Sequence, residues 1–125
     1  MSIVLLVGLG GFGGATLRYL AGRWVLDLSG HPDFPYPTLV VNALGCLLIG
    51  ILYGLGEDRH FFNQEVRSLL AVGLLGGFTT FSTFSIETLT LFRDGVVLQA
   101  IANIALQLAV TLAAVTLGFY AARAV

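Results

Sequence analysis

The sequence predicts an all-α integral membrane protein with four transmembrane helices. Of its 125 residues, 57% are hydrophobic and only 10% are charged, and the mean hydropathy is +0.92. Soluble domains carry about 25% charged residues, so this composition indicates a membrane protein. Residues 37–56, 68–86 and 95–122 contain no charged side chain. Each stretch is long enough to cross a bilayer, because about 20 apolar residues span its hydrocarbon core. With a fourth span near the amino terminus, residues 1–125 form one multi-pass domain of the cell membrane.

The first helix is expected over residues 3–26, which are apolar apart from Arg18 and Arg23. A basic residue at the centre of a membrane helix costs about 2.5–3.5 kcal/mol, so Arg18 should reach a wet vestibule, a carboxylate or backbone carbonyls. No basic segment precedes the apolar run. We therefore expect no cleaved secretory signal, and the first helix stays in the mature protein.

Glycines in and beyond this helix have two interpretations. Residues 8–13 match the dinucleotide fingerprint G-x-G-x-x-G. That fingerprint needs a βαβ unit ending in an acidic residue, whereas apolar helices follow here, so nucleotide binding is rejected. Three glycine pairs instead have a spacing of four, which lets helix backbones approach closely: Gly10 with Gly14, Gly50 with Gly54, and Gly73 with Gly77.

The second helix is expected over residues 37–56, after a proline-rich connection. Thr38 and Asn42 lie four residues apart and so share one helix face. Asn42 either pins neighbouring helices together or donates hydrogen bonds to a pathway. Cys46 is the only cysteine, so an intrachain disulfide is impossible. His31 and His60 fall in different loops, and we expect no metal site there.

The third helix, expected over residues 66–91, contains the most informative segment. Residues 76–85 combine a glycine pair, phenylalanines at every third position, and five hydroxyl side chains. In lipid such a stretch must face protein or a wet cavity. Ring edges are electropositive, and hydroxyl groups donate, so together they replace water around a small anion without trapping it. A break at Gly76-Gly77 would also free carbonyl oxygens, which are cation ligands. The segment therefore predicts a permeation site.

Polar residues also mark the rest of the chain. Glu87, at the border of the third helix, either reaches the interface or lines a pathway. A turn at residues 93–95 leads to a fourth helix with an uncharged run of about 42 Å, which implies tilt or protrusion. Its polar residues are spaced by four and favour a wet face: Asn103, Gln107 and Thr111.

The charges are too evenly placed to fix one orientation. The net charge is −1, and the six arginines are scattered, so no nucleic acid partner is expected. Both termini and the loop at 57–67 share one side of the membrane, with three arginines against two on the other side. This balance favours an antiparallel homodimer with one copy in each orientation. The alternative is a single orientation fixed by other features.

Three motifs together resemble the Fluc family of fluoride channels. They are Gly-Gly-Phe-Gly-Gly-Ala-Thr-Leu-Arg-Tyr at 10–19, Pro-Thr-Leu-Val-Val-Asn-Ala-Leu-Gly at 37–45, and Gly-Gly-Phe-Thr-Thr-Phe-Ser-Thr-Phe-Ser-Ile-Glu at 76–87. The resemblance covers essentially the whole chain. It implies a dual-topology antiparallel homodimer with two pores that exports fluoride passively and performs no enzymatic step.

The resemblance also implies roles for particular residues. Phe81 and Phe84 would turn ring edges to fluoride, and Asn42 would donate a hydrogen bond near the path. The carbonyls of Gly76 and Thr79 from both copies would hold a structural sodium ion at the dimer interface. The remaining assignments are polar pore lining by Ser82, Thr83 and Thr38, and a vestibule position for Glu87. In the family the fourth helix is usually described with hydroxyl side chains, so the amides of this chain depart from the pattern.

Two other classes of function compete. A small multidrug transporter needs a membrane-embedded acid, but the first helix has no carboxylate before Asp27, and Glu87 lies at an edge. A nonconducting scaffold protein would use the glycines and phenylalanines for packing. That interpretation leaves the clustered hydroxyls unexplained.

Overall fold

The fold is known from a computed structural model, which describes residues 1–30, 33–59 and 62–125. Within these ranges it contains helices and no strand: α1 (Ile3–Ser29), α2 (Tyr36–Arg59), α3 (Gln64–Arg67), the π-helix η1 (Ser68–Leu75), α4 (Gly76–Phe78), α5 (Phe81–Arg93) and α6 (Val97–Arg123). Elements α3 to α5 form one interrupted helix. By length and composition, four segments are able to cross a membrane: Ile3–Ser29, Tyr36–Gly56, Gln64–Arg93 and Val97–Arg123. The predicted four-helix membrane fold is confirmed. The two histidines lie outside the described residues.

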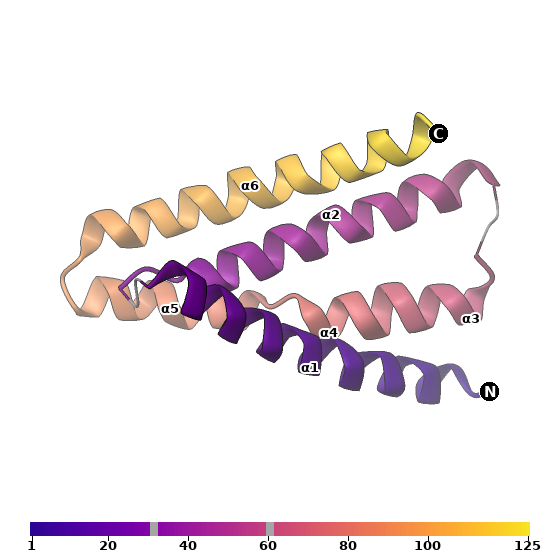
Figure 1. Cartoon of the computed structure of the whole chain (residues 1–125), viewed down its shortest axis with the longest axis horizontal. Coiled ribbons are helices and arrows are strands. Elements are labelled where there is room, and N and C mark those ends of the chain that lie inside the picture. The colour runs from indigo at the N-terminus through magenta and orange to yellow at the C-terminus, as the bar shows by residue number, and fades with distance from the viewer. Residues whose placement is uncertain (31–32, 60–61) are drawn as a thin grey trace.

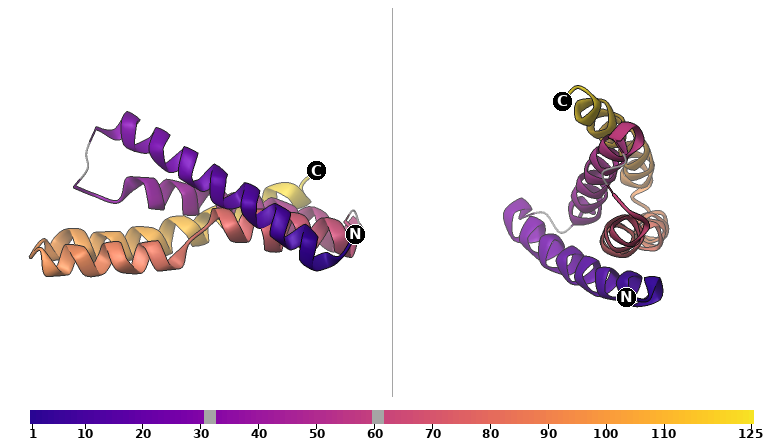
Figure 2. Two further views of the ribbon diagram at one scale, coloured as in Figure 1. Left: turned by 90° about the horizontal axis from the view of Figure 1, so that it is seen from below. Right: turned by 90° about the vertical axis from the view of Figure 1, so that its right-hand side faces the viewer.

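The four spans pack as two pairs. α2 lies along α6, while α1 packs against η1 and α4 (Figure 1). Figure 2 shows that α1 crosses the other helices at an angle and diverges from them towards its carboxyl end. Both termini and the α2–α3 connection lie at one end of the bundle, as predicted, and the other two connections lie at the opposite end. Parts of the interrupted helix are contacted by α1, α2 and α6.

Two glycines with positive φ set the connections at one end of the bundle. Gly30 has φ 60° and donates its amide to the Leu26 carbonyl at 3.3 Å, which closes the last turn of α1. This cap extends the helix three residues past the predicted end at residue 26. Gly95, with φ 78°, makes the tight turn between α5 and α6.

Close packing through glycine is confirmed for all three predicted pairs. A methyl group on Gly14 would collide with the Leu74 carbonyl, and one on Gly77 would lie 2.8 Å from the Gly11 carbonyl. On the other side of the bundle, Gly50 faces the Val115 carbonyl in the same way. In a bilayer the hydrophobic effect gives helices little reason to associate, so this backbone proximity is what holds the two pairs together.

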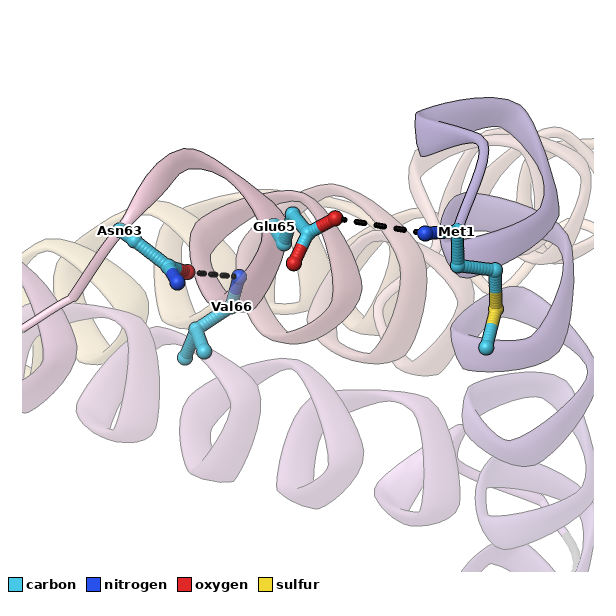
Figure 3. A network of polar contacts seen from close by, with 4 residues as sticks. All are labelled: Met1, Asn63, Glu65 and Val66. Carbon is cyan, nitrogen blue, oxygen red and sulfur yellow. Dashed lines mark hydrogen bonds and ion pairs between the residues drawn. The ribbon is translucent and has the colours of Figure 1, made fainter.

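The interrupted helix begins two residues earlier than predicted, because Asn63 caps it. The Asn63 side chain accepts a hydrogen bond from the Val66 amide at 2.9 Å (Figure 3). Beside it, the Met1 amino group lies 3.5 Å from the Glu65 carboxylate. Both groups of this ion pair are about half exposed, so it contributes little to stability. It does place the start of α1 next to the start of α3.

The predicted break in the third helix is confirmed, but its predicted position is wrong. Gly76 and Gly77 remain helical, and the chain is extended at Thr79 and Thr80 instead, with ψ 158° and 121°. Glycine flexibility is therefore not the cause of the break. Gly77 is needed where it lies because α1 approaches there, and hydrogen bonds from elsewhere in the fold open the helix two residues further on.

The adjacent residues Gly13 and Gly14 offer a matched test of this packing. Gly14→Ala should destabilise the protein by about 1–3 kcal/mol, because the new methyl group overlaps the Leu74 carbonyl. In Gly13→Ala the added carbon lies 3.5 Å from Leu74 Cδ1, which is an ordinary contact, so stability should be unchanged or slightly raised. Thermal unfolding in detergent, followed by gel filtration, measures both. Equal stability of the two variants would contradict the close approach of α1.

Candidate functional site

The site is built around the extended pair Thr79–Thr80 between α4 and α5. Thr80 is the N-cap of α5, where its hydroxyl oxygen accepts a hydrogen bond from the Thr83 amide at 3.3 Å. Before the break, both the amide and the hydroxyl of Thr79 donate to the Leu75 carbonyl, at 3.0 and 3.1 Å. One threonine therefore closes the helix before the break, and the next threonine starts the helix after it.

Asn42 of α2 holds the break open. The Thr80 amide donates to Asn42 Oδ1 at 2.9 Å, and Asn42 Nδ2 donates back to the Thr80 carbonyl at 3.0 Å. The Asn42 side chain thus replaces the backbone partners that Thr80 would have in a continuous helix. The same Nδ2 atom also donates to Gln107 Oε1 of α6 at 3.2 Å. Three elements far apart in the sequence are joined at this point.

The break leaves several carbonyl oxygens without their helical donors, those of Gly76 and Thr79 among them. In a continuous helix the Thr80 amide would pair with the Gly76 carbonyl, and the Thr83 amide with the Thr79 carbonyl. The first amide donates to Asn42 Oδ1, and the second donates to Thr80 Oγ1. Oxygens freed in this way at unwound helices are the usual ligands of Na⁺ in membrane proteins. The two residues are those predicted as sodium ligands, and their oxygens fit that chemistry.

An uncharged cleft of about 210 Å³ lies beside the break, and we name it the Phe81 cleft. Its lining residues are Asn42, Cys46, Thr79, Thr80, Phe81, Phe84, Gln107, Leu108 and Thr111. The rings of Phe81 and Phe84 meet edge to face, with centroids 5.3 Å apart and planes at 65°. Phe84 is only 9% exposed, whereas Phe81 is 75% exposed in the single chain. The cleft therefore combines aromatic rings and neutral polar groups without any charged side chain.

A second cleft, of about 300 Å³, includes the other side of Thr80 and is named the Arg18 cleft. It lies among α1, α2 and α5, and its polar lining comes from Arg18, Tyr19, Arg23, Thr38, Thr80 and Thr83. Arg18 is therefore placed in a cleft, as expected for a basic residue within a membrane helix. Since Thr80 lines both clefts, the break separates a cationic space from a neutral one.

A third and larger cleft, of about 720 Å³, lies at the end of the bundle where α5 and α6 meet. Its polar lining includes Glu87, Gln99, Asp33 and Asp94. Glu87 Oε1 accepts a hydrogen bond from the Thr38 hydroxyl at 2.7 Å. Glu87 thus points inward to α2 rather than extending away to the interface, and Thr38 connects the acidic cleft with the Arg18 cleft.

The predicted site residues are therefore largely brought together. Asn42, Phe81 and Phe84 share the Phe81 cleft, while Thr38 and Thr83 lie in the Arg18 cleft. Ser82 is exposed, with its hydroxyl 3.2 Å from that of Thr80. The family resemblance implied that Asn42 donates a hydrogen bond near the path. In this structure it donates to Thr80 and Gln107, and so acts as a clamp on the break.

The polar stripe of α6 faces the other helices. Asn103 is fully buried, and its Nδ2 donates to Thr88 Oγ1 of α5 at 3.0 Å. Gln107, one turn further on, reaches Asn42 and the Phe81 cleft. Its contact with Asn42 was not predicted, although the spacing of Asn103, Gln107 and Thr111 had indicated one polar face.

Fold and site together define a small membrane transport protein. Discontinuous helices with unpaired carbonyls occur in membranes where the irregular backbone lines an ion or substrate site. Here the discontinuity lies at the centre of a four-helix domain and is bordered by polar clefts.

The chain belongs to the CrcB family, described as CrcB-like protein, Camphor Resistance (CrcB), which it matches over residues 5–119. Its curated relatives include proteins of Shewanella sp. (strain W3-18-1) and Shewanella putrefaciens (strain CN-32 / ATCC BAA-453), each 48% identical. A third, from Shewanella baltica (strain OS185), is 46% identical. All three alignments cover 94% of both chains, and all three relatives are named "Fluoride-specific ion channel FluC". The family inferred from the three sequence motifs is confirmed.

Removing the Asn42 clamp should cost more stability than removing an ordinary helix cap. Asn42→Ala leaves the amide and carbonyl of Thr80 without their partner, and the expected loss is about 2 kcal/mol or more. Asn63→Ala is the matched control, since it removes one exposed capping bond worth about 1 kcal/mol. Apparent melting temperatures in detergent compare the two variants. An Asn42→Ala protein as stable as Asn63→Ala would mean that the break does not depend on the clamp.

Proposed function

We propose that this chain is a fluoride-selective channel through which the anion leaves the cytoplasm passively. The observation that carries the proposal is the Phe81 cleft, an uncharged space of neutral donors and ring edges at an interrupted membrane helix. The proposal is supported by relatives 48% identical over 94% of the chain, which are named as fluoride-specific ion channels. A channel of this kind performs no chemical step and is not an enzyme.

The chemistry of the cleft suits an anion that must enter and leave quickly. Fluoride gives up strongly bound water, so the protein must return hydrogen bonds and positive potential to it. Neutral donors and aromatic edges supply both, and they bind less tightly than a fixed cation would. The pore-lining residues proposed on this basis are Phe81, Phe84, Asn42, Thr38 and Thr83, with Arg18 and Glu87 at the vestibules. Ser82 is added because its hydroxyl lies 3.2 Å from that of Thr80, which lines two of the clefts.

Outward flow needs no energy source. Hydrogen fluoride crosses membranes uncharged and dissociates in a more alkaline cytoplasm, which concentrates the anion inside the cell. The negative interior potential then drives fluoride out through any selective pore. A passive channel is therefore sufficient to lower cytoplasmic fluoride.

The working form is an antiparallel homodimer. Phe81, which lines the proposed pathway, is 75% exposed in the single chain, and a second copy packed there would cover it. The arginines hardly distinguish the two ends of the bundle. Arg59, Arg67 and Arg123 end α2, α3 and α6 on one side, and Arg23 and Arg93 lie near the ends of α1 and α5 on the other. Both orientations are then accessible to insertion, and two opposed copies complete the site.

A structural sodium ion at the dimer interface is part of the proposal. The Gly76 and Thr79 carbonyls lack their helical donors, and Gly76 is exposed on the single chain. Two copies related by a two-fold axis would offer four such oxygens. A sodium ion held there would neutralise the paired carbonyl dipoles and link the two copies at their breaks.

Ion flux in proteoliposomes tests the function directly. Purified protein should release fluoride down its gradient, and chloride release measured in parallel should be far slower, because chloride is larger and a weaker hydrogen-bond acceptor. Folded protein that releases neither anion would overturn the channel assignment and favour a scaffold. Release of both anions at equal rates would overturn the selectivity.

Within this assay, Phe81→Ile separates a pathway role from packing. The substitution removes the ring edge while leaving an apolar side chain, and fluoride release should fall about five- to tenfold with the dimer intact. Phe92→Ile is the matched control, because Phe92 is an exposed ring on the same helix that lines none of the three clefts. Unchanged flux in Phe81→Ile would assign that ring to packing.

Sodium removal tests the dimer. Replacing Na⁺ by a bulky organic cation should lower the melting temperature of the dimer, because the Gly76 and Thr79 carbonyls then repel one another across the interface. A dimer whose melting temperature does not depend on sodium would contradict the ion site.

Tags on the two termini test the antiparallel arrangement. Accessible tags should be found on both faces of the membrane in one preparation. Tags confined to one face would contradict the antiparallel arrangement.

A further inference from the structure

The hydrogen bonds at the break fix the orientation of the Asn42 carboxamide. A backbone amide only donates, so the Asn42 atom that faces the Thr80 amide at 2.9 Å must be the oxygen Oδ1. The other end of the side chain is then Nδ2, which carries two protons. One proton goes to the Thr80 carbonyl, and the other goes to Gln107 at 3.2 Å. Asn42 therefore has no proton left to donate to a ligand.

The orientation of Gln107 follows from that of Asn42. Because Asn42 Nδ2 donates, the Gln107 atom that faces it must be the acceptor Oε1. Gln107 Nε2, which carries two protons, therefore points away from Asn42. The side chain is only 4% exposed, and Nε2 has no hydrogen-bond partner in the part of the chain that the structure describes. A buried donor without an acceptor is unfavourable, so an acceptor from outside the chain, such as an anion, would stabilise it.

Gln107 lines the Phe81 cleft, and the hydroxyl and amide side chains around it already donate elsewhere. The Thr79 hydroxyl donates to the Leu75 carbonyl, and the Thr111 hydroxyl donates to the Gln107 carbonyl. The Thr80 hydroxyl donates to Thr83 Oγ1, and the Thr80 amide is bound by Asn42. Among the described side-chain nitrogen and oxygen donors of that lining, Gln107 Nε2 is the one without an acceptor.

We infer that the Gln107 carboxamide donates the hydrogen bond that receives fluoride in the Phe81 cleft, with Asn42 as the positioning residue that orients it. This inference rests on the proposed function. The hydrogen bonds form a series in one direction: the Thr80 amide donates to Asn42, Asn42 donates to Gln107, and Gln107 would donate to the anion. Each hydrogen bond in such a series polarises the next, so a neutral amide becomes a better donor without carrying a charge.

Gln107→Met tests the role of this donor in flux. The variant keeps the length of the side chain, and Asn42 keeps both of its bonds to Thr80, so the dimer should assemble as in the wild type. Fluoride release from proteoliposomes should fall about tenfold or more, as expected for a lost hydrogen bond to an ion. Gln64→Met is the matched control, because Gln64 is exposed in α3 and lines none of the three clefts, and its flux should equal that of the wild type.

Nuclear magnetic resonance of the wild-type dimer distinguishes a hydrogen bond from Gln107 to fluoride from a purely structural role of Gln107. With nitrogen-15 in the side-chain amides of Asn and Gln, the Gln107 signal is identified by its loss in Gln107→Met, and the Asn42 signal by its loss in Asn42→Ala. Sodium fluoride should shift the Gln107 signal, whereas sodium chloride at the same concentration should not.

A Gln107 signal insensitive to fluoride, in a protein that conducts fluoride, would overturn this inference while leaving the channel function in place. A shift of the Asn42 signal alone would reassign the donor to Asn42. If Gln107→Met fails to assemble, Gln107→Glu identifies the signal, and the titration of the wild type still decides.

Discussion

The site depends on one pair of hydrogen bonds, those between the Asn42 carboxamide and the backbone of Thr80. A membrane helix is hard to interrupt, because each freed amide or carbonyl must find a partner without water. Asn42 supplies both partners from a neighbouring helix, so the chain becomes extended there at little cost. Everything else at the centre of the fold follows from this pair, including the freed carbonyls of Gly76 and Thr79, the cap on α5 and the orientation of Gln107.

The glycines allow this arrangement rather than cause it. Gly14 and Gly77 bring α1 against the interrupted helix, and Gly50 brings α2 against α6. The backbone contacts hold Thr80 within reach of both Asn42 and the Arg18 cleft. In a soluble protein large apolar side chains would hold the helices together, but in lipid they have as much reason to face the bilayer as each other. Close backbone packing therefore decides which polar groups meet.

Charge is distributed so that the Phe81 cleft, the central part of the proposed pathway, is neutral. Arg18 and Arg23 line the cleft on one side of Thr80, and acidic residues line the cleft at the end of the bundle, whereas the Phe81 cleft contains no charged side chain. Basic residues near an entrance raise the local concentration of an anion. A neutral binding region then keeps the anion from being held too tightly to leave.

The amino-acid sequence by itself determined the four spans, the common side of the termini, the glycine contacts and the family, because all of these depend on composition, local spacing or motifs. It also indicated that residues 76–85 are exceptional. Only the tertiary structure decided that the helix opens at Thr79–Thr80 rather than at Gly76-Gly77, and that Gln107 contacts Asn42. The physical reason is that these features depend on hydrogen bonds between residues 38 and 65 positions apart. Helical periodicity gives the face on which a side chain lies, but the donor that it meets across the bundle is set by how the helices pack.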